Sequence, residues 1–322
     1  MFLTGFVFIY FLLSGDASGR SLATLYIFYG GFCGGGVGLS YNTLLGVATR
    51  HYPGRGGMAT GILLLGFGAG ALLLGGFVTY LIAKIGINYT FLVLGCLLAA
   101  ILFIGSFFIH LPSVDSAGEI NIEKTKNKML SEAVAKPSFW ILCIWNICMC
   151  IGGLIVLNSA VPIAVRFGML AVLGLIISVF NGIGRLFIGI LMDNIGRRKA
   201  MLFNSFIMVI GGVLMMMGSL TELQLFIYLG FPFVGLGYGG TPTLLSAVVN
   251  KFYGPKNFQN ILAVATFSLG IAAIIGPIMS SKLQELSGGE YMSSFVVIII
   301  VAILAVCLCV LLNAFSRREG LE

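Results

Sequence analysis

An arginine lies inside one of the most apolar stretches of this sequence. Arg185 stands well within the run 169–192, which otherwise contains no charged residue. A permanent cation at the centre of a membrane helix costs about 2.5–3.5 kcal/mol on insertion scales, so something must compensate it. The planar guanidinium can hold a carboxylate through two parallel hydrogen bonds. We therefore predict that Arg185 binds a small carboxylate; the alternative is an arginine paired within a helix bundle or reaching the cytoplasmic surface.

Other polar residues in apolar runs could line the same binding path. Asn181 precedes Arg185 by one helical turn and shares its face. For each candidate, a hydrogen bond between two helices is the alternative. The predicted binding group comprises Arg185, Asn181, Tyr41, Asn42 and Asn158.

A second constellation follows the run that holds Arg185. Asp193 stands at the end of this run, and a basic turn comes directly after it. A carboxylate there can pair with the basic turn and with the positive N-terminus of a neighbouring helix, which would latch one conformation. The predicted latch comprises Gly189, Asp193, Gly196, Arg197 and Arg198.

The sequence shows no Ser/His/Asp arrangement and no metal-binding cluster, so we expect no enzyme, no metal and no cofactor. The glycine-rich stretch 235–240 superficially resembles a phosphate-binding loop. Because it follows no strand and lies within an apolar run, we interpret it as a helix-packing surface.

The amino-acid composition indicates that the protein lies in a membrane rather than in water. Of 322 residues, 59% are apolar and only 9% are charged, and the mean hydropathy is +1.07. Soluble domains usually carry about 25% charged residues. We therefore expect an all-α integral membrane protein, since backbone polar groups must be paired internally in lipid.

The apolar runs give the predicted helices. After the first run, each is long enough to cross a bilayer. About ten transmembrane helices are predicted, at 1–15, 22–49, 57–83, 88–110, 138–165, 169–192, 200–219, 223–249, 259–281 and 291–315.

Basic residues concentrate in alternate loops. One set of loops and the C-terminal tail hold Arg50, Arg55, Lys124, Lys126, Lys128, Lys136, Arg197, Arg198, Lys199, Lys251, Lys256, Arg317 and Arg318. The opposite set holds only Arg20, Lys84, Arg166 and Lys282. The positive-inside rule then predicts that the first set and both termini are cytoplasmic. It also explains the net charge of +7 without a nucleic-acid partner.

An internal repeat organises the chain. At an offset of 200 residues, Thr43-Leu44-Leu45 falls on Thr243-Leu244-Leu245, and a short basic loop follows each. Parallel repeats around a linker are typical of a fold with two six-helix bundles. We predict an N-terminal bundle over 1–110, a solvated cytoplasmic linker over 111–136 and a C-terminal six-helix bundle over 137–322. The N-terminal bundle then has four helices and its first two are missing; a natural ten-helix protein is the alternative.

Two segments resemble a known family. Gly189, Asp193 and Gly196-Arg197-Arg198-Lys199 resemble the G-x-x-x-D-x-x-G-R-R-K signature of the major facilitator superfamily. The segments 41–76 and 252–257 resemble its oxalate/formate antiporter and monocarboxylate transporter branches.

This resemblance implies a secondary transporter of small organic anions, with two bundles that rock about a midplane site. In the monocarboxylate branch a similarly placed arginine serves the substrate, but an acid often stands where this chain has Asn181, which argues against proton coupling. The run 259–281 lacks the second cation of oxalate carriers, so we expect a monoanion. We expect a monomer in the plasma membrane, with the bilayer and the substrate as partners. An inactive partial chain, or a carrier of another solute, is the alternative.

The charge pattern makes a prediction about topology. A reporter inserted between residues 120 and 130 should report a cytoplasmic location, because this segment belongs to the lysine-rich set of loops. The measurement compares reporters that are active on only one side of the membrane. Activity on the outer side would contradict the predicted orientation.

Overall fold

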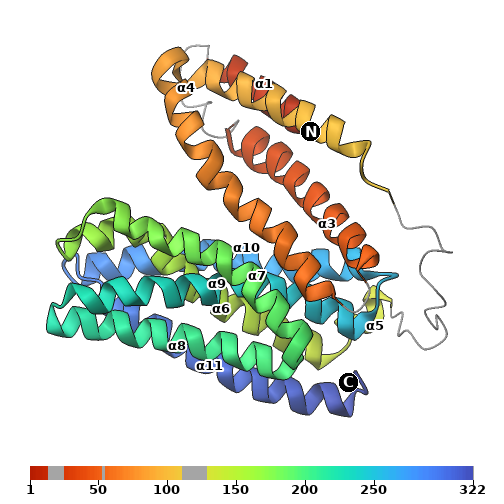
Figure 1. Cartoon of the computed structure of the whole chain (residues 1–322), viewed down its shortest axis with the longest axis vertical. Coiled ribbons are helices and arrows are strands. Elements are labelled where there is room, and N and C mark those ends of the chain that lie inside the picture. Colours follow the sequence, from red (N-terminus) through yellow and green to blue (C-terminus); the bar gives the residue numbers. More distant parts are fainter. Residues whose placement is uncertain (14–24, 53–54, 111–128, 322) are drawn as a thin grey trace. The chain divides into compact units, whose positions relative to one another are not determined.

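We describe a computed structural model of the chain, which covers residues 1–13, 25–52, 55–110 and 129–321. These residues form helices and short connections, and no strand occurs among them (Figure 1). Two compact units are present, one of residues 1–51 and 69–120, the other of residues 52–68 and 121–322. The predicted all-α architecture is confirmed. The predicted division at 110 and 136 stays a prediction, and most of that linker lies outside the described residues.

The N-terminal unit contains α1 (Phe2–Leu13), η1 (Tyr26–Cys33), α3 (Gly34–His51) and the later part of α4 (Gly56–Ser106). Aromatic rings join α1 to α4. The Phe6 and Phe91 rings lie 6.0 Å apart, and those of Tyr10 and Tyr89 lie 5.4 Å apart. Phe6 is buried at the first contact, whereas Tyr89 is about half exposed at the second.

The helix α4 is broken at Gly86, which has φ +78° and ψ 167°. This left-handed φ suits glycine, which has no Cβ to clash. The break lies between the two predicted runs 57–83 and 88–110, and Lys84 stands beside it. It therefore separates two apolar segments of α4.

The C-terminal unit holds six long helices side by side (Figure 1). They are α6 (Pro137–Arg166), α7 (Ile176–Ile195), α8 (Arg197–Thr221), α9 (Gln224–Tyr253), α10 (Phe258–Leu286) and α11 (Met292–Arg318). The short helices α5 (Leu130–Val134) and η3 (Ala171–Leu175) precede α6 and α7. The segment of α5 had been expected to be part of the solvated linker.

Several of these helices suit a lipid environment. Among the described residues, six segments are long and apolar enough to cross a membrane: 74–106, 137–166, 172–195, 197–221, 258–286 and 292–318. On α11, the large apolar residues Ile300, Ile303 and Val310 are each at least half exposed, at 58%, 50% and 59%. Such exposed apolar faces need lipid rather than water as solvent. The total of ten transmembrane helices stays a prediction.

The first and last long helices of the C-terminal unit pack against each other. The Ser138 hydroxyl donates to the Glu319 carboxylate at 2.5 Å, and the Ser138 amide donates to it at 3.3 Å. Deeper in the unit, the fully buried Trp145 donates from Nε1 to the Ser205 hydroxyl at 3.1 Å, which joins α6 to α8. These bonds reduce the cost of burying the polar groups of Ser138, Trp145 and Ser205.

The helices α7 and α9 cross at very short range because glycines face the contact. A Cβ at Gly235 would lie 2.6 Å from the Ile177 carbonyl, and a Cβ at Gly239 would overlap the Asn181 carbonyl. Gly235 and Gly239 are four residues apart and so share one face of α9. Such a spacing of small residues allows close helix packing in membranes. The interpretation of 235–240 as a packing surface is confirmed.

The helix boundaries also follow the internal repeat. The helices α3 and α9 end at His51 and Tyr253, and α4 and α10 begin at Gly56 and Phe258. Each boundary in α3 and α4 lies about 200 residues before its counterpart in α9 and α10, which is close to the offset at which the sequence matches itself. The rotation that would relate the two windows stays a prediction.

The α7–α9 crossing predicts that Gly239→Ala destabilises the protein by about 1–3 kcal/mol, the usual cost of overpacking a core. The matched control is Gly270→Ala on α10, where a Cβ would meet nothing within 4 Å. The control should be neutral or slightly stabilising, since Ala favours helix over Gly. Thermal unfolding in detergent measures both. Equal melting temperatures for the two variants would contradict this account of the crossing.

Candidate functional site

The Asp193 carboxylate holds the beginning of another helix. It lies on the last turn of α7 and accepts hydrogen bonds from the amides of Gly57 at 3.0 Å and Met58 at 2.7 Å. These amides belong to the first turn of α4, where no carbonyl of the same helix is available to accept from them. A negative charge there also interacts favourably with the helix dipole. We call this pair of bonds the Asp193 clasp.

Glycines make the clasp geometrically feasible. A Cβ at Gly57 would lie 2.5 Å from the Gly189 carbonyl and 2.7 Å from the Asp193 Oδ1 atom. A Cβ at Gly61, one turn later, would lie 2.6 Å from the Arg185 carbonyl. The first turns of α4 therefore touch the backbone of α7 directly, with no side chain between them.

The turn after Asp193 consists of a single residue. Gly196 separates α7 from α8 and has φ +80°, a conformation that other residues rarely adopt. Arg197 then begins α8 and is only 3% exposed. Its Nη2 atom donates to the Ser316 hydroxyl at 3.1 Å, and its guanidinium carbon lies 4.9 Å from the centroid of the Phe252 ring. The basic turn is thus anchored to α9 and α11.

Arg185 lies two turns deeper than the clasp, about 12 Å from Asp193 along the axis of α7. Its side chain is 8% exposed, and Nη1 donates to the Leu64 carbonyl of α4 at 2.8 Å. A second side chain of α7 therefore bonds to the backbone of α4. The alternative of an arginine that reaches the cytoplasmic surface does not describe this buried position.

Asn181 shares the face of Arg185 and is 9% exposed. Its backbone carbonyl faces Gly239, so it also belongs to the α7–α9 crossing. Within the described part of the chain, its Oδ1 atom has no hydrogen-bond partner. Such a buried polar atom is typical of a position where a ligand or water completes the bonding.

Tyr238 is a polar residue at the crossing of α7 and α9 that was not among the predicted binding residues. It stands on α9 between Gly237 and Gly239, next to the glycine that faces the Asn181 carbonyl. Its ring fills the space beside Gly153 of α6, where a Cβ would overlap it. The glycines around it hid this residue, since the stretch was interpreted only as a packing surface.

The remaining predicted binding residues belong to other helices than Arg185. Asn158 lies on α6 with an exposed side chain. Tyr41 and Asn42 belong to α3 in the N-terminal unit, where Asn42 donates to the Gly38 carbonyl of its own helix at 3.0 Å. Their place in a shared site stays a prediction.

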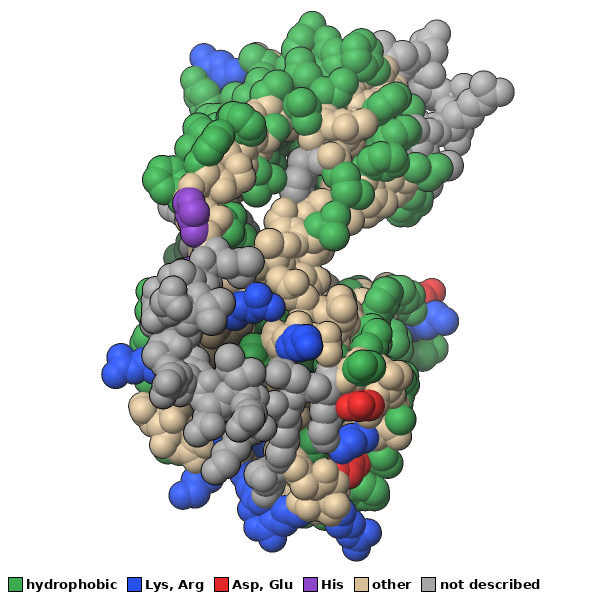
Figure 2. Space-filling view, turned by 90° about the vertical axis from the view of Figure 1, so that its right-hand side faces the viewer, with side chains coloured by type: hydrophobic (Ala, Val, Ile, Leu, Met, Phe, Trp, Pro, Cys, Tyr) green, Lys and Arg blue, Asp and Glu red, His purple; other side chains and the backbone are tan. Residues whose placement is uncertain are grey.

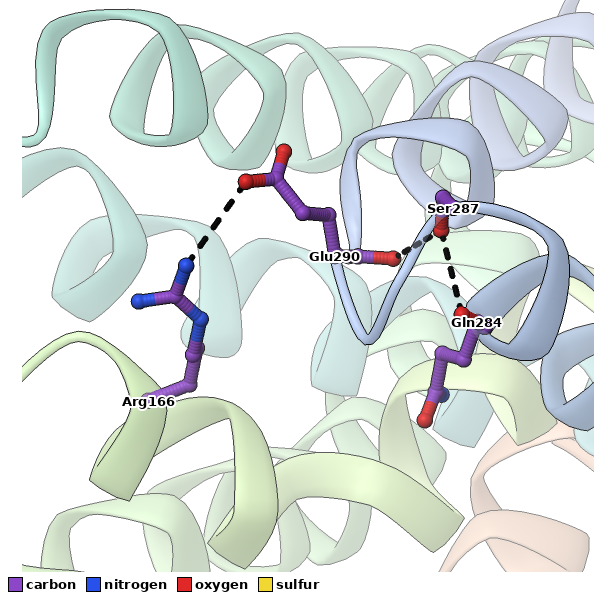
Figure 3. Close-up of polar contacts among 4 residues, drawn as sticks. All are labelled: Arg166, Gln284, Ser287 and Glu290. Atoms are coloured by element: carbon purple, nitrogen blue, oxygen red, sulfur yellow. Dashed lines mark hydrogen bonds and ion pairs between the residues drawn. The ribbon is translucent and has the colours of Figure 1, made fainter.

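The C-terminal unit has a pocket at each end. One pocket, of about 300 Å³, is lined by the basic side chains of Arg197, Arg198, Lys199 and Lys251. The other, of about 240 Å³, lies at the end where α6 stops and contains Arg166 and Glu290. Their ion pair measures 3.6 Å, and the Ser287 hydroxyl donates to the Glu290 carbonyl at 2.8 Å (Figure 3). No cluster of metal-binding side chains occurs among the described residues.

Comparison with known proteins identifies the family. A profile described as Major Facilitator Superfamily matches residues 1–277, most of the chain. The chain belongs to the major facilitator superfamily. The two-bundle fold class predicted from the sequence agrees with this membership.

Two relatives within the superfamily have names that bear on function. The chain is 27% identical over 263 residues to the uncharacterized MFS-type transporter YhjX of Escherichia coli (strain K12), covering 80% of this chain and 65% of the relative. It is 26% identical over 246 residues to the oxalate:formate antiporter of Oxalobacter formigenes, covering 74% of this chain and 58% of the relative. The chain thus spans less than two thirds of the length of these relatives.

The clasp predicts that Asp193→Ala exposes the beginning of α4 to exchange. Losing hydrogen bonds to a charged group costs about 1.5–3 kcal/mol each, so the amides of Gly57 and Met58 should exchange at least tenfold faster. Asp193→Asn keeps an acceptor but loses the charge, so its effect should be smaller. Hydrogen–deuterium exchange of peptides that cover 55–62 measures this change.

The matched control for the clasp is Asn194→Ala, which alters the neighbouring exposed side chain. Its exchange over 55–62 should match that of the unaltered protein. The clasp would be refuted if Asp193→Ala left exchange at this segment unchanged.

Proposed function

We propose that this protein is a secondary active transporter that moves small organic anions across a membrane by alternating access. Membership in the superfamily supports transport, and the relative named as an oxalate:formate antiporter supports anionic substrates. The observation that carries the substrate class is the buried cation of Arg185 in the middle of α7.

The guanidinium of Arg185 suits a carboxylate ligand. It carries five N–H donors in a planar fork, so it can bind a carboxylate while Nη1 remains bonded to Leu64. Burial strengthens such a contact because little water screens the charges. Asn181, one turn earlier on α7, and Tyr238, beside the glycine that faces Asn181, would contribute polar groups to the same site.

The sequence favours a monocarboxylate over a dianion. In α10, no Lys or Arg occurs before Lys282, which stands near the end of the helix. A dianion would leave its second carboxylate without a matching cation, and an unpaired charge in a dry site is costly. We therefore propose monocarboxylates as substrates. Tyr41, Asn42 and Asn158 are proposed to line the remainder of the path.

The Asp193 clasp is proposed to act as a conformational latch. Its two bonds join α7 to the first turn of α4, and α4 continues along the chain into the N-terminal unit. A rocking motion of two bundles needs contacts that form in one state and break in another. Gly189, Gly196, Arg197 and Arg198 would serve this latch by shaping and anchoring the turn around Asp193.

The setting of the protein follows from the same proposal. We infer a multi-pass protein of the plasma membrane, with both termini in the cytoplasm, that works as a monomer and catalyses no chemical reaction. The basic end of the C-terminal unit, which carries many blue side chains in Figure 2, supports the orientation by the positive-inside rule.

The proposed site predicts that Arg185→Gln lowers the apparent affinity for monocarboxylates at least tenfold, since a charge-assisted contact contributes about 1.5–3 kcal/mol. Arg185→Lys keeps the charge but loses the two-pronged geometry, so an intermediate defect is expected. The measurement is uptake into proteoliposomes of formate, lactate, pyruvate and the dianion oxalate. Thermal unfolding is recorded in parallel.

The matched control is Arg166→Gln, which removes one arginine from the exposed ion pair with Glu290. Exposed pairs contribute little, so affinity and stability should stay nearly unchanged. A normal affinity in Arg185→Gln would rule out the carboxylate role. Absence of uptake by the unaltered chain for every anion would favour the inactive alternative, and preference for oxalate would overturn the proposed monoanion.

A further inference from the structure

The basic pocket of the C-terminal unit is lined by cationic residues that do not belong to the proposed transport site. It forms where the turn from α7 to α8, the end of α9 and the residue Leu321 meet. Four of its lining residues are basic, and none of the lining residues carries a side-chain carboxylate. The pocket is therefore a strongly positive hollow at one end of a helix bundle.

Two carboxylates of the described residues near the turn accept hydrogen bonds outside the pocket. Both oxygens of Asp193, four residues before Arg197, accept amide hydrogen bonds from α4. The Glu319 carboxylate accepts from Ser138 at the start of α6. Neither of these two carboxylates belongs to a residue that lines the pocket.

Part of the pocket is rigid. Arg197 is almost fully buried, stacks on the Phe252 ring and donates to Ser316, so its guanidinium is held in place before any ligand arrives. Lys199 and Lys251 are exposed and can move toward an anion. A fixed cation with flexible lysines around it suits a phosphate group, which accepts hydrogen bonds in several directions.

The remaining walls are apolar. Ile195, Phe252 and Leu321 line the pocket beside the cations, and Ile195 is 40% exposed at the end of α7. A free inorganic anion gains nothing from such walls, whereas a lipid places apolar glycerol and acyl groups next to its phosphate. The helices that form the pocket, α7 and α8, are long and apolar enough to cross a membrane, so their ends lie at headgroup depth.

From these features we infer that this pocket binds the phosphate headgroup of an anionic phospholipid. Basic pockets between transmembrane helices are known to hold such headgroups. The site lies on the turn next to the Asp193 clasp and is separate from Arg185, so its existence does not depend on the substrate proposed above.

The test uses the full chain purified in detergent and mixed with phosphatidylglycerol or phosphatidylcholine. Lipid binding is measured by native mass spectrometry, and thermal unfolding is followed in the same mixtures. We expect phosphatidylglycerol to bind and stabilise the protein more than phosphatidylcholine does. In the double variant Lys199→Gln/Lys251→Gln, the affinity for phosphatidylglycerol should fall about thirtyfold, since each basic residue near an anionic lipid surface contributes about 1 kcal/mol.

The matched control is Lys256→Gln/Arg317→Gln, which removes two exposed positive charges outside the pocket lining. It should retain most of the phosphatidylglycerol affinity. An equal loss in both double variants would overturn the site in favour of general surface attraction. Equal binding of both lipids by the unaltered chain would also overturn it, as would stabilisation by inorganic phosphate without any preference for phosphatidylglycerol. None of these outcomes depends on transport activity.

Discussion

The clasp between Asp193 and two backbone amides determines how the beginning of α4 meets α7. The first amides of a helix have no acceptor within the helix, and leaving them unpaired away from water is costly. A carboxylate can reach both only if the two backbones nearly touch, which explains why Gly57 and Gly189 face each other. The one-residue turn at Gly196 ends α7 three residues after Asp193 and begins α8 directly afterwards, so no long loop lies at this contact. Glycine at these places is a consequence of the hydrogen bonds.

Two side chains of opposite charge attach α7 to the same helix. Asp193 accepts from amides at the start of α4, and Arg185 donates to a carbonyl two turns further along it. Both recognise backbone groups, so the contact fixes the position of α4 along α7 largely independently of the side chains that α4 carries. A change at one attachment should therefore be felt at the other, which would connect the proposed binding role of Arg185 with the proposed latch role of Asp193.

The positions of the helices could be predicted from the sequence, whereas the hydrogen-bond partners of their side chains could not. The apolar runs placed the helices, and Gly86 and Gly196 fall at predicted breaks because polar residues flank both positions. The burial of Arg185 followed from its apolar surroundings. Its bond to Leu64 did not, because the acceptor is a backbone carbonyl 121 positions away and every residue has such a group. The Ser138–Glu319 and Trp145–Ser205 hydrogen bonds also join residues far apart in the sequence, so they could not be predicted from it. Tyr238 was overlooked because the glycines on both sides dominated the interpretation of its segment.

The pairing of α6 with α11 has a consequence for biosynthesis. The first long helix of the C-terminal unit, α6, packs against the last, α11. The Ser138–Glu319 bonds join the start of α6 to the end of α11. During synthesis, α6 enters the membrane long before α11 is translated. In that interval the packing face of α6 and the Ser138 hydroxyl must be covered by lipid, by the insertion machinery or by a transient neighbour. The bundle is therefore completed only after α11 has been made, so this unit cannot finish folding before α11 leaves the ribosome.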